Sequence, residues 1–371
     1  MSTRIMRPTA VMAIFVCLLT AHVGVAQETT TSFSIEPGFT LGDDPDEPVE
    51  AFFDQPALVS VDSKGNIFVA DRGGLEIKMF DPNGSFLRAF GGEGSAPGEY
   101  QTLTGLTVSP TDEVVVVDGR SRRVTFIDSE SGEVRTGGID VKTNLEIAPY
   151  GDRFFVASND FYGSDDVDLV AEYDGRMQRT AKIANGEEVL PDKDDLLVQS
   201  IFLGDPGSIA VISKDSVIYA PTLYDGRVYL YTRASSEGLW AREQLRGTSY
   251  KPALTRLNST AREADVVTRY RGSDFKAMLH GESRGLFSLR GGRIVHFAVL
   301  ERQDRVVFVA ELMTRSGDLV GTHELLSKPL RRNVAQTIRW QVAWGDGEGN
   351  FLVIDREEVP VVRRLEMSVL E

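Results

Sequence analysis

The sequence contains one cysteine, Cys17, in 371 residues. It lies in residues 1–26, which have the pattern of an export signal: Arg4 and Arg7 precede an apolar stretch that ends in small residues. If this segment is removed, the mature chain has no disulfide, no cysteine nucleophile and no thiolate metal site. We therefore expect an exported protein, periplasmic or extracellular, whose fold depends on its hydrophobic core.

Basic residues and long apolar runs are also scarce. The 40 Lys and Arg residues face 55 Asp and Glu residues, which gives a formal net charge of -15. Nucleic acid and anionic membrane both require a compensating basic surface, so neither is expected as a partner. After residue 26 no window approaches the roughly 20 consecutive apolar residues of a membrane span. We expect no membrane span.

Six short apolar segments recur along the chain and read as β-strands. They are Ile67–Asp71, Val114–Asp118, Phe154–Ser158, Val217–Pro221, Ile294–Ala298 and Phe351–Asp355. Each is followed by another strand, and several are preceded by one across a turn rich in Gly, Asp or Asn. Their starts lie between 40 and 77 residues apart. Constant strands with loops of variable length predict an all-β, six-bladed β-propeller of antiparallel four-stranded blades, over residues 27–371.

The ends of the chain complete this interpretation. The sixth blade lacks a strand at the C-terminus, while residues 32–41 form a strand-like stretch with no neighbour to pair with. An unpaired strand edge invites aggregation, so a propeller gains from closing its ring. We therefore expect residues 32–41 to close blade six.

Residues 246–281, between blades four and five, break the strand pattern. Apolar residues recur there at spacings of three and four, the period of an amphipathic helix. They are Leu254, Leu257, Ala261, Ala264, Val267 and Tyr270. Pro252 precedes them and Gly272 follows them. We therefore predict a helical insertion, with its helix over about 252–270, on the face where turns between second and third strands emerge (the funnel face).

Two stretches resemble the NHL repeat, in which a glycine-rich turn and an apolar strand precede a strand ending in Val-Ala-Asp. Residues 61–71 read Val-Asp-Ser-Lys-Gly-Asn-Ile-Phe-Val-Ala-Asp, and the glycine-rich stretch 91–100 precedes Val114–Asp118. The resemblance covers about 56–128 and 343–355. In blades three to five, Ser158, Pro221 and Ala298 replace the Asp of the repeat. The resemblance implies a six-bladed propeller, but the family includes both binding scaffolds and enzymes, so it does not decide the function.

Several acidic residues have both a structural and a functional interpretation. Asp346-Gly-Glu-Gly-Asn350 could curl around calcium, but it occupies the same turn as Asp62-Ser-Lys-Gly-Asn66, where Asp, Asn and Gly are favoured for backbone reasons. Asp71, Asp118 and Asp355 recur at one position of their blades, which favours a carboxylate that binds loop amides. The acidic cluster 160–168 departs from calcium-loop spacing and favours a solvated loop.

Histidine offers little for metal chemistry. His280, His296 and His323 all fall in the insertion and blade five, so they are poorly placed to converge on the propeller axis. His296 alternates with apolar residues, as a hydrogen-bonded strand histidine does. No Gly-x-Ser-x-Gly elbow is present, although counting residues does not exclude a Ser-His-Asp triad.

Arginine and tyrosine gather in loops that belong on the funnel face. The candidate ligand-binding residues are Arg72, Tyr100, Arg120, Arg122, Tyr162, Tyr224, Arg302 and Arg356. Both residue types concentrate binding energy, and a guanidinium can grip a carboxylate with two hydrogen bonds; pairing with nearby Asp is the alternative. We expect a non-enzymatic binding or scaffolding propeller of the cell envelope, without a cofactor, that recognises a peptide, a protein or a small acidic ligand.

The alternative function is a calcium- or other metal-dependent hydrolase or lyase of the propeller lactonase type. Such an enzyme requires several Asp, Glu, Asn or His residues directed into the pore. The expected inner strands 58–62, 105–109, 209–213 and 286–289 are mostly apolar or hydroxylic. The composition of these strands therefore favours the binding function.

Overall fold

Alternation of apolar residues gives each central strand two buried faces. In β7 (Glu113–Asp118), Val114 and Val116 pack against the preceding sheet, whereas Val115 and Val117 pack against the following sheet. Successive side chains of a strand point to opposite faces, so a strand that is apolar throughout must lie between two layers. Sheets built in this way stack face to face around an axis.

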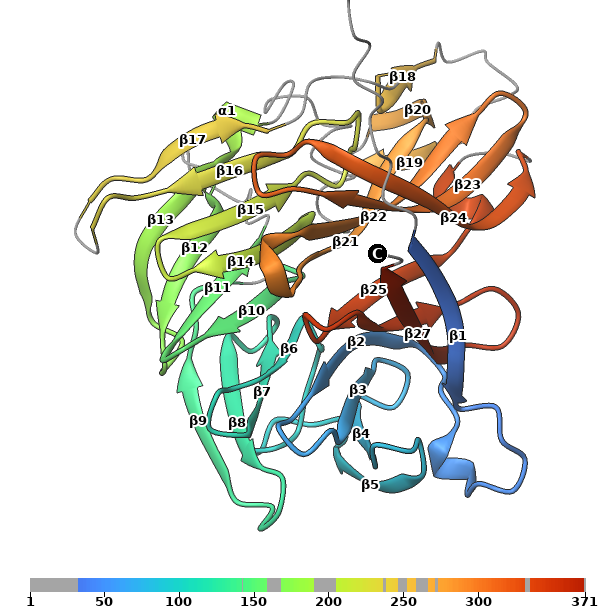
Figure 1. Cartoon of the computed structure of the whole chain (residues 1–371). Helices are drawn as coiled ribbons and strands as arrows, with labels where there is room; N and C mark the ends of the chain where they lie inside the picture. The colour runs from blue at the N-terminus through green and yellow to red at the C-terminus, as the bar shows by residue number, and fades with distance from the viewer. Residues whose placement is uncertain are drawn as a thin grey trace, which may run out of the picture. The chain divides into compact units, whose positions relative to one another are not determined.

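The computed structural model describes residues 33–141, 143–158, 168–189, 205–235, 238–245, 252–257, 266–270, 273–330 and 334–369. They form six antiparallel sheets of four strands and one smaller sheet (Figure 1). The all-β, six-bladed propeller is thus confirmed. The described residues contain two α-helices of four residues each, α1 (Gly186–Val189) and α3 (Val334–Thr337).

Blades one to three follow one another along the chain. Blade one contains β2 (Pro56–Val61), β3 (Ile67–Asp71), β4 (Glu76–Phe80) and β5 (Phe86–Gly91). Blade two contains β6 (Gly105–Val108), β7, β8 (Arg123–Asp128) and β9 (Val134–Gly138). Blade three contains β10 (Glu146–Tyr150), β11 (Arg153–Ala157), β12 (Asp168–Asp174) and β13 (Arg179–Asn185).

Blades four to six repeat the plan with longer connections. Blade four contains β14 (Ser208–Ser213), β15 (Ser216–Ala220), β16 (Tyr229–Thr232) and β17 (Ala241–Gln244). Blade five contains β21 (Gly281–Ser288), β22 (Ile294–Arg302), β23 (Arg305–Met313) and β24 (Leu319–Pro329). Blade six contains β25 (Trp340–Gly345), β26 (Asn350–Asp355) and β27 (Val361–Val369) from the C-terminal end, and β1 (Phe33–Leu41).

The inner strands close a ring. Each of β2, β6, β10, β14, β21 and β25 contacts the inner strand of the next blade, and β25 returns to β2 (Figure 1). In blade six, β1 pairs antiparallel with β27, from Phe33 opposite Val369 to Leu41 opposite Val362. Phe33, Ile35 and Leu41 are buried. The last sheet is therefore built from both ends of the described chain.

The predicted helical insertion is wrong. The described parts of residues 252–279 form a three-stranded sheet of β18 (Leu254–Arg256), β20 (Ser273–Leu279) and β19 (Val266–Tyr270). The stretch Val-Val-Thr-Arg-Tyr of β19 consists largely of β-branched and aromatic residues, which favour strands, and pairing with β20 satisfies its backbone. Ala261 and Ala264 lie outside the described residues.

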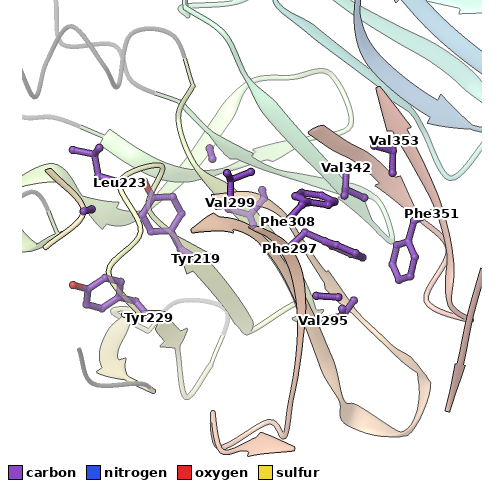
Figure 2. Packing of buried hydrophobic residues seen from close by; sticks show 14 of the residues in the cluster. Tyr219, Leu223, Tyr229, Val295, Phe297, Val299, Phe308, Val342, Phe351 and Val353 are labelled. Carbon is purple, nitrogen blue, oxygen red and sulfur yellow. The ribbon is translucent and has the colours of Figure 1, made fainter. Parts of the chain in front are cut away.

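The hydrophobic core lies between neighbouring blades. Figure 2 shows one part of it, where Phe297 of blade five packs against Phe351 of blade six with ring centroids 5.0 Å apart. Phe308 stacks on the other side of Phe297, at 6.0 Å. Burying such side chains contributes about 1.5–3 kcal/mol each.

No helix in the described ranges is long and apolar enough to cross a bilayer.

Candidate ligand-binding site

The six inner strands surround a central channel with a volume of about 1050 Å³. In every blade the inner strand begins the antiparallel meander, including blade six, where β25 leads into β26 and β27. The six inner strands therefore run in the same direction along the channel. Their N-terminal ends and the turns after the second strands therefore lie at one end of the channel, the funnel face of the sequence analysis. Charged side chains gather at this end.

Four arginines from three neighbouring blades line the funnel end of the channel: Arg72 of blade one, Arg284 of blade five, and Arg339 and Arg356 of blade six. We call it the arginine end. Arg72 and Arg356 each follow the Asp that ends a second strand, β3 or β26. Arg284 lies within β21, and Arg339 immediately precedes β25. Arg72 and Arg356 thus occupy the same turn position in their blades, and both line the channel.

The hydrogen bonds of these arginines are mostly to neutral groups. Arg72 donates from Nε to Leu103 O and from Nη2 to Asn144 Oδ1, both at 2.8 Å. Arg356 donates from Nε to Pro56 O at 3.0 Å. Within the described residues neither Arg72 nor Arg356 forms an ion pair with a carboxylate. The acceptors of the hydrogen bonds from these two guanidinium groups are therefore backbone and amide oxygens, which carry no formal charge.

Arg284 and Arg339 have partners of their own. Arg284 Nη2 lies 2.5 Å from Glu282 Oε2, and its Nη1 lies 3.5 Å from Gln341 Oε1. Arg339 donates from Nη2 to the backbone oxygen of Glu357. Among the described contacts of these four arginines, only Arg284 is therefore held by a carboxylate through its guanidinium.

Three carboxyl groups near the arginine end, those of Glu146, Asp205 and Glu282, have raised pKa values, and Asp54 and Glu358 also line this end. The pKa of Glu146 is raised to about 8, mainly by burial and also by the charge of nearby Asp205, although the amide of Ile209 donates to the carboxyl at 3.0 Å and lowers it. Burial also raises the pKa of Asp205 and of Glu282, with Arg284 acting in the opposite direction on both. The carboxyls therefore neutralise the arginines less than their number implies.

The pKa of Arg356 reflects the balance of positive and negative charge around it. Its pKa is lowered to about 10, first by burial and then by the charges of Arg284 and Arg72, with Asp205 opposing and Arg339 adding to the effect. A guanidinium normally stays charged far above this range. Like charges around Arg356 thus outweigh the single opposing carboxylate, and the arginine end favours an anion.

The predicted binding residues separate into four groups. Arg72 and Arg356 line the channel. Arg120 is exposed, Arg302 is partly exposed, and Arg122 lies 3.5 Å from Asp140, so none of these three is among the described residues that line it. Tyr162 lies outside the described residues.

The other two predicted residues, Tyr100 and Tyr224, have buried side chains. Tyr100 is enclosed by the glycine-rich turn before blade two: a side chain at Gly91, whose φ is +97°, would approach its ring within 2.5 Å. Tyr224 is drawn against blade five by a bridge between Leu223 and Glu282, and its hydroxyl donates to Glu311 Oε2 at 2.7 Å. Both tyrosines therefore pack in the interior and do not expose their side chains at the surface.

Sequence reasoning missed Arg284, Arg339 and the three carboxyl groups. One signal was available, because Glu282 and Arg284 are charged residues within an inner strand whose other residues are small or apolar. Glu146 and Asp205 carry no motif, and their proximity arises only when blades three and four meet.

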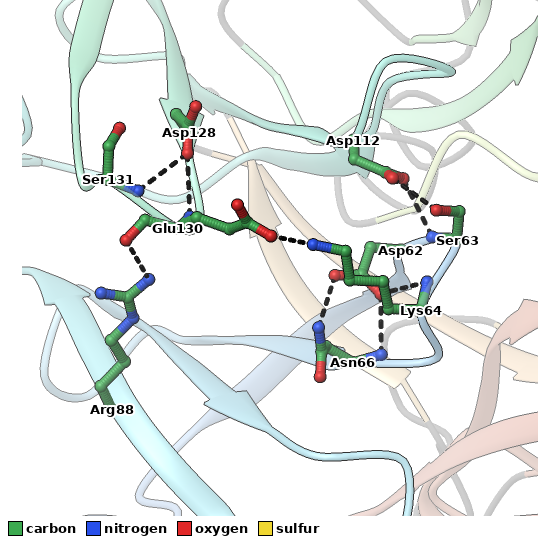
Figure 3. A network of polar contacts seen from close by, with 9 residues as sticks. All are labelled: Asp62, Ser63, Lys64, Asn66, Arg88, Asp112, Asp128, Glu130 and Ser131. Atoms are coloured by element: carbon green, nitrogen blue, oxygen red, sulfur yellow. Dashed lines mark hydrogen bonds and ion pairs between the residues drawn. The ribbon is translucent and has the colours of Figure 1, made fainter.

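The repeated aspartates have the structural role that the sequence predicts. Asp62 Oδ1 accepts from the amides of Lys64 and Asn66 at 2.9 and 2.8 Å (Figure 3), and Asp346 binds its own turn in the same way. Asp71 and Asp118 accept from the amides that lead into β2 and β6. The turn interpretation is therefore confirmed. Of the acidic cluster only Asp168 is described, and it pairs with Arg179 and Lys182.

The histidines form two relay-like arrangements. His296 lies 3.0 Å from Ser283 Oγ and 3.1 Å from Glu311 Oε2, and all three side chains are buried, which leaves Ser283 no access for a substrate. His280 lies between Thr255 and Glu301, at 2.8 and 2.5 Å, away from the channel lining.

The third histidine, His323, packs near the ring of Phe33, with ring centroids 5.8 Å apart. In the described part of the chain no three His, Asp or Glu residues are placed to hold a metal ion.

The solved structures that are similar to this chain include two proteins from Bacteroides. A candidate exported protein of Bacteroides fragilis has a TM-score of 0.51 and 12% identity, covering 94% of this chain and 98% of its own. A member of the DUF4221 family from Bacteroides vulgatus has a TM-score of 0.52 and 11% identity, covering 92% and 100%. At these identities the likeness shows the propeller fold. No known family profile and no curated protein matches the sequence, so membership of the NHL family is not confirmed.

Proposed function

We propose that this chain is an exported, non-enzymatic binding propeller that takes an anionic ligand at the arginine end of its central channel. The observation that carries the proposal is the convergence of Arg72, Arg284, Arg339 and Arg356 on one channel mouth. Burial lowers the pKa of Arg356, and repulsion from the guanidinium groups of Arg284, Arg72 and Arg339 adds to this effect. An anion placed among them would offset that repulsion.

Guanidinium chemistry supports the choice of ligand. Arginine presents a rigid fork of donors that matches carboxylate or phosphate with two parallel hydrogen bonds. Arg72 and Arg356 each use Nε on a backbone oxygen, and Nη1 of Arg72 and both Nη groups of Arg356 have no protein acceptor within the described residues. The anchored Nε holds each fork in place before a ligand arrives, which reduces the entropy lost on binding.

The experiment is a calorimetric titration of the protein with benzoate, succinate and phosphate near neutral pH. The test variant carries Arg72→Met and Arg356→Met. The matched control carries Arg120→Met and Arg122→Met, which remove the same charge from the same face outside the channel. We expect at least one anion to bind and the test variant to weaken it about tenfold or more, with little change in the control.

Two further readouts complete the test. The bound anion should be recovered chemically unchanged after incubation, as mass spectrometry would show; a converted ligand would favour an enzyme. Equal affinities in the test variant and the wild type, or no binding of any of the three anions, would overturn the proposal.

A further inference from the structure

We infer that the ligand is an amphipathic anion, whose head group lies at the arginine end and whose bulky apolar body extends into the channel. This inference rests on the proposed function and adds the class of ligand. It comes from the division of the channel wall into a charged end and an apolar interior.

The charged residues of the channel are confined to its ends. Of the described lining residues, eight of the nine charged ones belong to the funnel end: Asp54, Arg72, Glu146, Asp205, Arg284, Arg339, Arg356 and Glu358. The ninth, Asp346, follows the C-terminal end of β25 and marks the opposite end. Six residues of strand span roughly 20 Å, so a long stretch of wall separates the two ends.

The wall between the ends is apolar and partly exposed. Its partly exposed apolar side chains are Leu58, Ile147, Ala148, Val211, Ile212, Phe287, Ala343 and Trp344, from five of the six blades. Two hydroxyls along this stretch are engaged with the backbone: Ser60 Oγ accepts from Val108 N at 2.9 Å, and Ser288 Oγ donates to Val211 O at 3.1 Å. A ligand body lying here meets apolar surface.

Size and shape favour a bulky body. The volume of about 1050 Å³ reaches the upper part of the range of about 300–1,000 Å³ that holds drug-sized ligands, so a small anion alone would leave most of the channel unfilled. Phe287 and Trp344 line the channel, and aromatic side chains pack well against flat ring systems. The head group must lie at the arginines, because a charge in the apolar stretch would lose its hydration without a partner.

The experiment compares naphthalene-2-carboxylate with acetate, which keeps the charge, and with 2-naphthol, which keeps the rings. We expect naphthalene-2-carboxylate to bind at least about tenfold more tightly than either, measured by calorimetry and by tryptophan fluorescence. Decanoate and naphthyl phosphate then distinguish ring from chain and carboxylate from phosphate.

Two wall variants test where the body lies. Ile147→Gln and Ile212→Gln place an amide on the channel wall, and each should weaken naphthalene-2-carboxylate several-fold while leaving the response to acetate unchanged. Leu87→Gln is the control, because Leu87 is 49% exposed on an outer strand of blade one. Each variant is first checked for an unchanged melting temperature, and two wall positions guard against one that does not fold.

The outcomes separate this inference from the proposed function. If acetate and naphthalene-2-carboxylate bind equally well and both depend on Arg72 and Arg356, the inference is overturned and the proposed function stands. If naphthalene-2-carboxylate binds but the two arginine substitutions have no effect, both are overturned. Tight binding that requires both the arginines and Ile147 or Ile212 supports both.

Discussion

Blades one and two are stabilised in a different way from blades three and four. In blade two, Asp118 at the end of β7 accepts hydrogen bonds from the amides of Gln101, Thr102, Arg120 and Ser121. Asp71 does the same in blade one, for Asp54 and Gln55. Each carboxylate ties the strand end to the chain that enters the same blade. The interaction is local and recurs with the repeat.

In blade three the strand-end Asp is replaced by Ser158, and buried charges link this blade to the next. Glu172 of β12 lies 2.8 Å from Arg233, which follows β16 of blade four, and both side chains are 2% exposed. Arg233 also lies 2.7 Å from Asp215 and stacks over Trp240, whose ring meets Phe155 of blade three. Blades three and four are therefore joined by an ion pair between residues far apart in the sequence.

The difference shows that a propeller can lose its repeat motif and keep its fold. Where the motif is present, local hydrogen bonds tie each blade to the chain segment that enters it. Where it is absent, specific contacts between blades replace it, as Tyr224 of blade four and Glu311 of blade five also do. We expect the second kind of blade to be more sensitive to single substitutions, because an unpaired buried charge costs more than a lost local hydrogen bond.

The largest expected effect is that of Arg233→Ala. It leaves Glu172 with Arg153 as its remaining partner at a buried site, so the free energy of unfolding should fall by about 3–5 kcal/mol. Urea denaturation measures this change. A loss below about 1 kcal/mol would mean that blades three and four do not depend on the ion pair.

Asp118→Ala should have a smaller effect, about 2–3 kcal/mol, because it removes the acceptor of several amides within one blade. Burial opposes ionisation of Asp118, but hydrogen bonds from Gln101, Ser121 and Thr102 outweigh it and hold the pKa of this carboxyl below its ordinary value. The stabilisation is therefore present at neutral pH and is lost as the pH falls through the lowered folded-state pKa. Denaturation of Asp118→Asn at neutral and acidic pH should show the gap to wild type narrowing in acid.

Glu146 should respond to pH in the opposite direction. Its folded-state pKa of about 8 exceeds the unfolded value of about 4.3, so the folded state keeps its proton while the unfolded state releases it. Stability from this group is complete below pH about 4 and is lost as the pH rises to about 8. Relative to wild type, Glu146→Gln should gain stability between pH 5 and 8, by up to about 1.4 kcal/mol per pH unit, measured by denaturant titration. A constant difference across that range would contradict the assignment.

The smallest effect is expected at the exposed pair Lys64–Glu130, which joins blades one and two at the surface (Figure 3). Both side chains are mostly exposed, and exposed ion pairs contribute about 0–1 kcal/mol. Lys64→Ala should therefore change the free energy of unfolding by less than about 1 kcal/mol. If Lys64→Ala lowered the free energy of unfolding as much as Arg233→Ala does, burial would not explain the difference between blades one and two and blades three and four.

Sequence and structure agree best where the signal is local. The period of two in β7 and the turn residues around Asp62 predict strands, turns and the propeller, because they depend on neighbouring residues. The same kind of reasoning failed at residues 252–270, where spacings of three and four predicted a helix. Pairing of β19 with β20 decided the structure there, and no window of sequence contains that information.

Local sequence patterns predict the blades, the turns and the turn positions of Arg72 and Arg356, because each lies at a fixed position of a repeated unit. The approach of Arg284, Glu146 and Asp205 to these arginines depends on ring closure, since the three residues come from three different blades. The tertiary structure also buries Tyr100 and Tyr224, which the sequence predicted for the surface. The physical reason is that strands are specified by local patterns, whereas the charge and polarity of a channel arise only when the ring closes and brings distant side chains together.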